Sequence, residues 1–185
     1  MRLVIALLAA LVALPALADA RFPQTTRVAG STLTLNGAGV RRMFFFKVYA
    51  VGLYVVRASR EADELLAEPG PKRVAIRMLR DVGAERFTEA LREGIRGNHD
   101  EAQLAALEPR IGELAALMKQ IGEAKEGMNI ALDWLPGTGT SIVIDGAARG
   151  KPIPGEDFYR ALLRIWLGAH PVQEDLKQSL LGEGG

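Results

Sequence analysis

The chain has 185 residues, of which 49% are hydrophobic and 24% charged, and its formal net charge is +1. A chain of this length can bury a sizeable core, and one domain is the default expectation. The balance of charges excludes a global field that would attract nucleic acid or an anionic membrane. The absence of cysteine excludes disulfides, thiol catalysis and thiolate metal ligands.

The N-terminus has the features of a secretory signal. A short basic start, Met1-Arg2, precedes an apolar run of roughly 15 residues that ends in small residues suited to cleavage after Ala18 or Ala20. This run is shorter than the about 20 apolar residues of a membrane-spanning helix. We therefore expect residues 1–18 to be a signal peptide, residues 21–185 to form the mature domain, and the protein to be periplasmic or secreted without a stable membrane anchor. An uncleaved N-terminal anchor is the alternative.

The first half of the mature chain predicts two strands, a short helix and a third strand. Alternating polar and apolar residues predict a strand over 32–37 that ends in a turn at Asn36-Gly37. The apolar run over 43–56 predicts one long strand, buried on both faces at the centre of the sheet. Ser59 is typical of an N-cap and predicts a helix over 59–66, and alternation predicts a strand over 73–79.

The second half predicts helices, a β-meander and two final helices. Apolar residues at helical spacing predict a helix over 83–95 and another over 100–121, the latter with Asp100 as N-cap and Pro109 as a point of interruption. The remaining segments are predicted as strands over 128–135 and 140–144, a continuation through 147–150, and helices over 156–167 and 173–181. The sum is an α+β domain with helices packed on one side of an antiparallel sheet.

The standard catalytic and metal-binding motifs are not supported. His99 and His170 lack a neighbouring carboxylate at ligand spacing, and Ser141 lacks the second glycine of a nucleophile elbow. The Gly37-Ala38-Gly39 segment precedes a strand, so it cannot place a helix N-terminus on a phosphate, and we expect a bend or a close backbone approach there. We expect no metal and no cofactor.

Arg41 and Tyr49 are the main candidates for ligand contacts. A guanidinium keeps its charge, so an Arg41 that points inward needs an anion from the protein or from a ligand. The alternatives are that Arg41 points to water and that Tyr49 is a core residue with a satisfied hydroxyl. Lys47 is a further candidate, because Lys47, Tyr49 and Val51 should share one face of a regular strand.

The order of these residues resembles the chalcone isomerase-like superfamily. The segment Asn36-Gly37-Ala38-Gly39-Val40-Arg41 and the strand Lys47-Val48-Tyr49-Ala50-Val51-Gly52-Leu53-Tyr54-Val55 are similar to the family pattern Gly-x-Gly-x-Arg followed by a strand of the type KxTxIGVYL. Residues 163–180 resemble the last two helices of that family. The resemblance implies an open-faced β-sandwich of chalcone-isomerase type, a long antiparallel sheet with a layer of helices on one side and a ligand cleft between them.

The catalytic residues of the plant enzymes are mostly replaced. Arg41 matches the arginine that attracts the substrate's phenolate, whereas the catalytic threonine is Tyr49 here, after a shorter hairpin. The family's tyrosine, lysine and asparagine on one helix and its threonine or serine on another fall on Phe87, Ala90, Gly94 and Ile165. The resemblance therefore implies that chalcone isomerase catalysis is absent.

The pairing of an arginine with a tyrosine is similar to the fatty-acid-binding branch of the superfamily. That resemblance implies a non-catalytic protein that binds a small amphipathic anion such as a fatty acid, with Arg41 and Tyr49 as headgroup contacts. Phe87 and Ile165 are candidates for the lining of the cleft, and Lys47 faces either the cleft or solvent. Phe44, Phe46 and Trp166 are further lining candidates. A guanidinium and a hydroxyl suit a carboxylate, and an apolar cleft suits its chain.

Two other classes of function remain open. One is an isomerase or lyase with an unknown substrate, in which Arg41 stabilises an oxyanion and Tyr49 is a general acid. The other is an interaction subunit whose cleft is filled by its own side chains, with an unknown protein partner. An apolar cavity that reaches Arg41 would argue against the interaction subunit, and a shifted tyrosine pKa inside that cavity would favour the enzyme.

Overall fold

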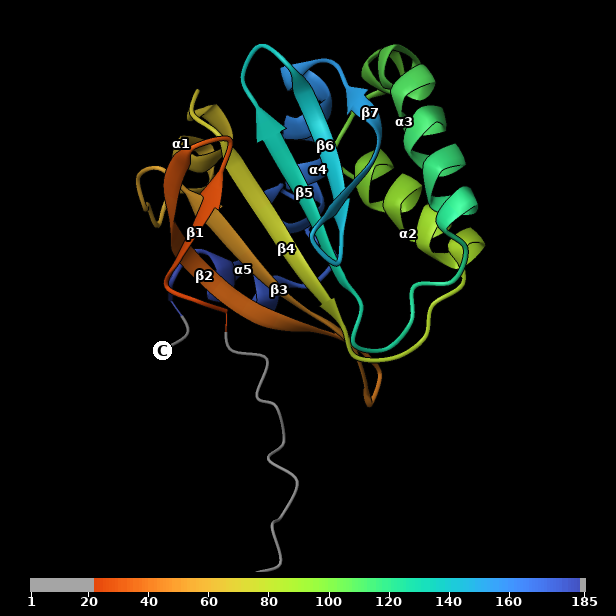
Figure 1. Cartoon of the computed structure of the whole chain (residues 1–185), viewed down its shortest axis with the longest axis horizontal. Coiled ribbons are helices and arrows are strands. Elements are labelled where there is room, and N and C mark those ends of the chain that lie inside the picture. The colour runs from red at the N-terminus through yellow and green to blue at the C-terminus, as the bar shows by residue number, and fades with distance from the viewer. Residues whose placement is uncertain (1–21, 184–185) are drawn as a thin grey trace, which may run out of the picture.

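A computed structural model describes residues 22–183 as one curled antiparallel sheet of seven strands with a layer of five helices (Figure 1). The predicted signal peptide lies outside the described residues. The elements in chain order are β1 (Thr25–Val28), β2 (Ser31–Met43), β3 (Phe46–Val55), α1 (Ala62–Ala67), β4 (Lys72–Met78), α2 (Ala84–Arg96), α3 (Glu101–Ile121), β5 (Asn129–Leu135), β6 (Gly139–Ile144), β7 (Ala147–Ile153), α4 (Glu156–Leu167) and α5 (Glu174–Leu180).

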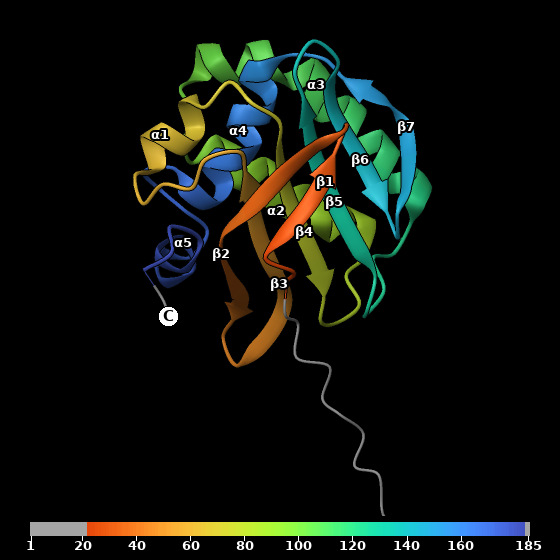
Figure 2. The same ribbon diagram turned by 60° about the vertical axis from the view of Figure 1, so that its left-hand side comes forward.

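The sheet is a simple meander. Its strand order is β1-β2-β3-β4-β5-β6-β7, and each strand pairs with the next in antiparallel register. Figures 1 and 2 show the helices gathered on one face of this sheet, with α5 beside β2. The predicted α+β class, the open-faced β-sandwich with a long antiparallel sheet and helices on one side, is confirmed. The middle strand is β4, so the expectation that the strand after Met43 is central is wrong.

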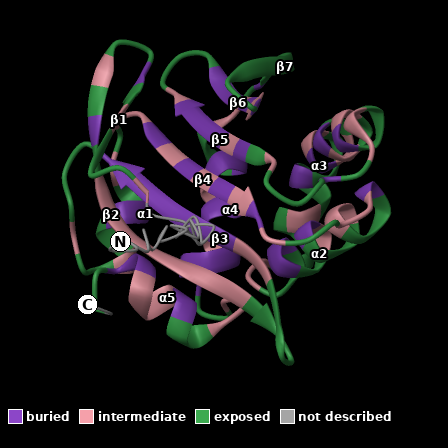
Figure 3. Ribbon diagram, turned by 60° about the horizontal axis from the view of Figure 1, so that its bottom comes forward, coloured by how far each residue is buried: buried purple, intermediate pink, exposed green. Residues whose placement is uncertain are grey.

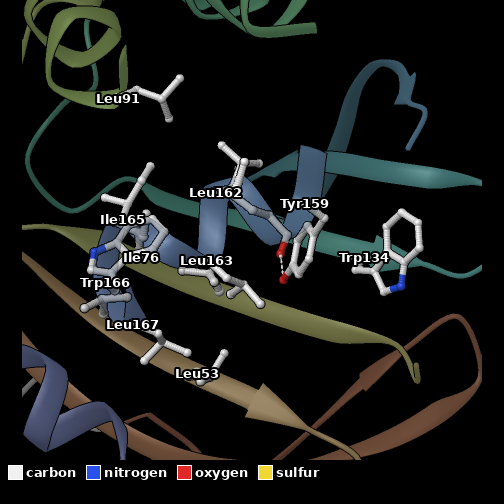
Figure 4. Close-up of a cluster of buried hydrophobic side chains, with 14 of the residues drawn as sticks. Leu53, Ile76, Leu91, Trp134, Tyr159, Leu162, Leu163, Ile165, Trp166 and Leu167 are labelled. Carbon is white, nitrogen blue, oxygen red and sulfur yellow. Dashed lines mark hydrogen bonds between the residues drawn. The ribbon is translucent and has the colours of Figure 1, made fainter. Parts of the chain in front are cut away.

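The main core lies between the sheet and the helix layer. Alternation on β3 sends Val51, Leu53 and Val55 into this core, while Tyr54 joins a smaller cluster with Val28 and Leu33. The helix α4 supplies more of the core from the other side than any other helix, and Figure 4 shows its side chains above β3 and β4. Its buried residues are Phe158, Tyr159, Ala161, Leu162, Leu163, Ile165, Trp166 and Leu167.

The hairpin between β2 and β3 corrects the prediction for residues 43–56. The strand β2 continues through Asn36-Gly37, where the structure has a register shift instead of a turn, and the chain reverses after Met43, which pairs with Phe46. The residues at the reversal carry no glycine or proline, and Phe44 takes the left-handed conformation with φ +54°. The segment is therefore two strands and a tight turn, in agreement with the hairpin that the family resemblance implies.

Other boundaries differ in smaller ways. The helix α1 begins at Ala62, because the Ser59 hydroxyl accepts the N–H of Glu61 in a local turn ahead of the helix. Asp100 caps α3 as predicted, with its carboxylate accepting from the Gln103 N–H at 2.8 Å. Pro109 lies inside α3 without ending it, since the buried stripe of the helix continues on both sides. The strand β1 was not predicted.

Candidate functional site

Arg41 and Tyr49 lie directly opposite each other on β2 and β3. The register then shifts by one residue, so that Arg42 pairs with Lys47 and Val48 is left as the extra residue of a β-bulge. Tyr49 packs against the main core. Lys47 is exposed beside Arg42, outside the buried part of the site. The prediction that Lys47 and Tyr49 share one face assumed a regular strand, and the bulge at Val48 interrupts that alternation.

The Tyr49 hydroxyl is held by a buried tryptophan. Trp166, on α4, donates its indole N–H to the Tyr49 Oη at 3.0 Å. Burial raises the pKa of Tyr49, and the hydrogen bond from Trp166 and the charge of Arg41 act in the opposite direction. The hydroxyl is therefore protonated at neutral pH. Trp166 occupies one lone pair of this oxygen, and the hydroxyl proton has no hydrogen-bond acceptor among residues 22–183.

Arg41 is hydrogen-bonded to Gln173, the N-cap residue of α5. Its Nη1 donates to the side-chain Oε1 of Gln173 at 3.2 Å, and also to the Arg42 carbonyl. The same Oε1 accepts the Arg42 backbone N–H at 2.8 Å, while Gln173 Nε2 donates to the Val40 carbonyl at 3.3 Å. Within the described chain no carboxylate forms an ion pair with Arg41. The guanidinium thus has a neutral partner and an uncompensated charge.

The Gly-x-Gly part of the sequence motif positions α5. A Cβ on Gly37 would lie 2.6 Å from the carbonyl oxygen of Leu180, and a Cβ on Gly39 would lie 2.7 Å from Leu176 Cδ1. Both glycines therefore allow α5 to lie against β2, which confirms the expected close approach. Asn36 was missed as a structural residue, although it opens the motif: its Nδ2 donates to the carbonyls of Ser59 at 3.0 Å and Leu180 at 2.7 Å.

Phe87 and Ile165 lie on the helices that cover the sheet. Ile165 is 4% exposed, and Phe87 is half-buried against the same core. A Cβ on Gly94 would lie 2.9 Å from Ile165 Cγ2, so α2 and α4 approach closely at Gly94 and Ile165. Gly94 and Ile165 fall on positions that carry polar side chains in the plant enzymes. In this protein the two positions are in close apolar contact.

Two of the predicted lining residues are not in the interior. Phe44 is 89% exposed and Phe46 is 59% exposed, because the chain reverses between β2 and β3. Figure 3 shows this turn in the colour of exposed residues. Their assignment to the cleft is therefore wrong. Trp166, by contrast, is buried and donates its indole N–H to Tyr49.

Three pockets of the described residues lie away from Arg41 and Tyr49. One of about 730 Å³ lies between α2 and α3, one of about 750 Å³ lies around Asn98, His99 and His170, and a third of about 260 Å³ lies beside Arg160. Arg41 and Tyr49 line none of these three. The raised pKa of Tyr49 is caused by burial, and none of these three pockets reaches its side chain.

Residues 22–183 contain no group of three or more His, Asp or Glu side chains placed to hold a metal ion. None of their helices combines the length and the apolar character that crossing a bilayer requires.

The sequence matches the model of a known protein family. The family model for chalcone isomerase-like proteins matches residues 15–182, nearly the whole chain. The protein belongs to the chalcone isomerase-like family. No curated protein matched the sequence. The crystal structure of a fatty-acid binding protein from Arabidopsis thaliana is similar to the structure of this chain, with a TM-score of 0.63 and 16% identity. The match covers 86% of this chain and 90% of that one. At this identity the similarity establishes the fold alone.

Proposed function

We propose that this chalcone isomerase-like protein is a periplasmic, non-catalytic binding protein for a small amphipathic anion such as a fatty acid. The observation that carries the proposal is the facing pair Arg41 and Tyr49: a guanidinium without an acidic partner among the described residues, next to a protonated hydroxyl with an unused proton. The fold shared with an Arabidopsis fatty-acid binding protein supports the proposal. The apolar N-terminal run supports export.

The chemistry of the pair suits a carboxylate. Arg41 and Tyr49 supply two charge-assisted hydrogen bonds from neighbouring strands. The acyl chain then follows the apolar side chains of Trp166 and Ile165, with a gain of about 0.8 kcal/mol for each methylene buried. In this arrangement the carboxylate replaces Gln173 Oε1 as the acceptor for Arg41, and the N-terminus of α5 moves to admit it.

The test is mass spectrometry of organic extracts from the full chain purified without detergent. Wild type, Arg41→Ala and Tyr49→Phe are compared with Arg60→Ala, an exposed arginine away from the site that serves as the charge-matched control. We expect a stoichiometric carboxylic acid in wild type and in Arg60→Ala, at least about tenfold less in Arg41→Ala, and an intermediate amount in Tyr49→Phe. Equal loading of all four proteins would overturn the assignment of the headgroup site.

Packing favours one further candidate, an interaction subunit whose cleft is filled by its own side chains. The close contact between Gly94 and Ile165, and the position of the three pockets away from Tyr49, are the observations behind it. If all four proteins come out empty, and added fatty acid neither binds nor raises the Tm of wild type, the interaction subunit replaces the binding protein.

A further inference from the structure

The β2–β3 hairpin ends in a strongly apolar tip. Met43, Phe44, Phe45 and Phe46 are 50%, 89%, 99% and 59% exposed, and they account for four of the five large exposed hydrophobic residues in the described chain. The three rings present on the order of 500 Å² of apolar surface. A contiguous patch of this kind on a soluble protein indicates contact with a partner or a membrane. The hairpin projects beyond the neighbouring strands in Figures 1 and 2.

Basic residues surround the base of this tip. Arg42 and Lys47 pair across the hairpin directly behind it, with Arg41 one residue further back. The guanidinium of Arg80 lies 5.0 Å from the centroid of the Phe46 ring, in a cation–π contact. The hairpin residues 41–47 include three cations and no carboxylate.

The acidic groups nearby belong to other elements. Asp81 accepts the Glu126 N–H at 2.8 Å and pairs with Lys125, so its charge is engaged within the loops. Glu174 begins α5, next to Gln173. The positive field at the tip is therefore local, and it is compatible with the small net charge of the whole chain.

The arrangement of apolar and basic residues matches the layers of a lipid bilayer. Arg42 and Lys47 lie about two residues behind the apex, which at about 3.3 Å per residue places their backbone roughly 7 Å from it. Interfacial protein segments bury their apolar side chains about 5–10 Å deep, while Lys and Arg remain at the level of anionic headgroups. An apolar tip that projects from the protein, with basic residues at its base, fits a bilayer directly. A protein partner would have to offer a matching apolar pocket.

We propose that the β2–β3 hairpin docks the protein reversibly onto an anionic lipid bilayer, with Phe44 and Phe45 inserted and Arg42, Lys47 and Arg80 at the headgroups. This docking surface is separate from the ligand site and does not depend on the proposed function. It also does not require a spanning anchor, since a single apolar tip with a few cations gives a reversible attachment.

The test is sedimentation of the full chain with lipid vesicles. Vesicles of phosphatidylcholine alone are compared with vesicles that contain about 30% phosphatidylglycerol. We expect binding to the anionic vesicles, a decrease of at least about tenfold for Phe44→Ser/Phe45→Ser and for Arg42→Ala/Lys47→Ala, and a marked loss for wild type in about 0.5 M NaCl. Val56→Ser is the matched control, because Val56 is an exposed apolar residue at the other end of β3, and its binding should equal that of wild type.

A second measurement places the contact at the tip. Phe45→Trp adds an indole at the apex, and its emission should shift to the blue on anionic vesicles, by comparison with wild type, in which only Trp134 and Trp166 emit. Equal vesicle binding by wild type and Phe44→Ser/Phe45→Ser would overturn the proposal and assign the attachment to another segment. No binding by wild type, together with a dimer that the double serine variant dissociates, would overturn it in favour of a second copy of the chain.

Discussion

Trp166 donates its indole N–H to the hydroxyl of Tyr49 at 3.0 Å, although 117 residues separate the two in the sequence. The bond joins the last turn of α4 to β3 at the place where β3 pairs with Arg41. Both side chains pack in the main core. The same contact therefore supports the packing of α4 on the sheet and fixes the orientation of the hydroxyl that we propose for ligand binding.

The first prediction concerns this hydrogen bond. Tyr49→Phe leaves the buried Trp166 N–H without its acceptor, and we expect a loss of about 1–3 kcal/mol in the free energy of unfolding. Trp166→Phe and the double variant complete a mutant cycle, measured by urea denaturation. The double variant should be more stable than the sum of the two single losses predicts. Strict additivity would show that the two side chains do not interact energetically.

The second prediction concerns alkaline pH. Burial raises the pKa of Tyr49, of Tyr54 and, most strongly, of Tyr159. Each folded-state pKa lies above the unfolded value near 10, so this stabilisation is complete below about pH 10 and is lost as the pH rises through the folded-state pKa. The free energy of unfolding should fall above about pH 10, by up to about 1.4 kcal/mol per pH unit for each buried tyrosine.

Replacement of one tyrosine provides the control for this pH dependence. In Tyr49→Phe one titrating group is absent, so the slope of stability against pH above about pH 10 should be shallower than in wild type. Urea unfolding at several pH values between about 8 and 11 measures both slopes. Identical slopes would mean that other groups cause the alkaline loss.

The third prediction compares two glycines. Gly37→Ala places a Cβ 2.6 Å from the backbone carbonyl oxygen of Leu180, and backbone atoms cannot move aside cheaply, so we expect a loss of more than about 2 kcal/mol and a weakened contact of α5. Gly112 lies inside α3 with open space around its Cβ position, and Gly112→Ala should stabilise the protein by about 0.5–1 kcal/mol. Thermal and urea unfolding measure both, and changes of the same sign would contradict the comparison.

The fourth prediction compares two ion pairs of different burial. Arg73 on β4 donates Nε and Nη2 to the carboxylate of Asp133 on β5 at 2.6 and 2.7 Å, and Nη1 to Thr26 on β1 at 2.9 Å. The Asp133 side chain is only 7% exposed, so Asp133→Ala leaves a partly buried guanidinium without its anion and should destabilise the protein by about 3 kcal/mol.

A surface pair with similar geometry is the control for Asp133. Arg110 also pairs through two nitrogens with Asp157, but the Asp157 side chain is 62% exposed. Asp157→Ala should therefore cost less than about 1 kcal/mol. Urea denaturation measures the free energy of unfolding of both variants. A loss for Asp157→Ala as large as that for Asp133→Ala would show that burial does not set the strength of these ion pairs.

Much of the fold follows from local sequence. Asp100 and Gly122 mark the two ends of α3, and the alternation of Lys72–Met78 predicts β4 almost to the residue. These predictions succeed because capping and period-two burial depend on neighbours in the chain. The candidate pair Arg41 and Tyr49 came from the order of the motif residues, and the structure places the two opposite each other on β2 and β3.

The sequence alone determined the class of fold, the family and most helix boundaries, because these depend on local periodicity, caps and motif order. Only the tertiary structure decided where the long apolar run reverses, since Phe44-Phe45 carries no turn residue and the reversal depends on the pairing of β2 with β3. The reversal leaves the Phe rings exposed and Lys47 outside the site. The packing of α4 on the sheet places Trp166 against Tyr49. Contacts between distant segments are set by the packing of whole elements, which no local pattern encodes.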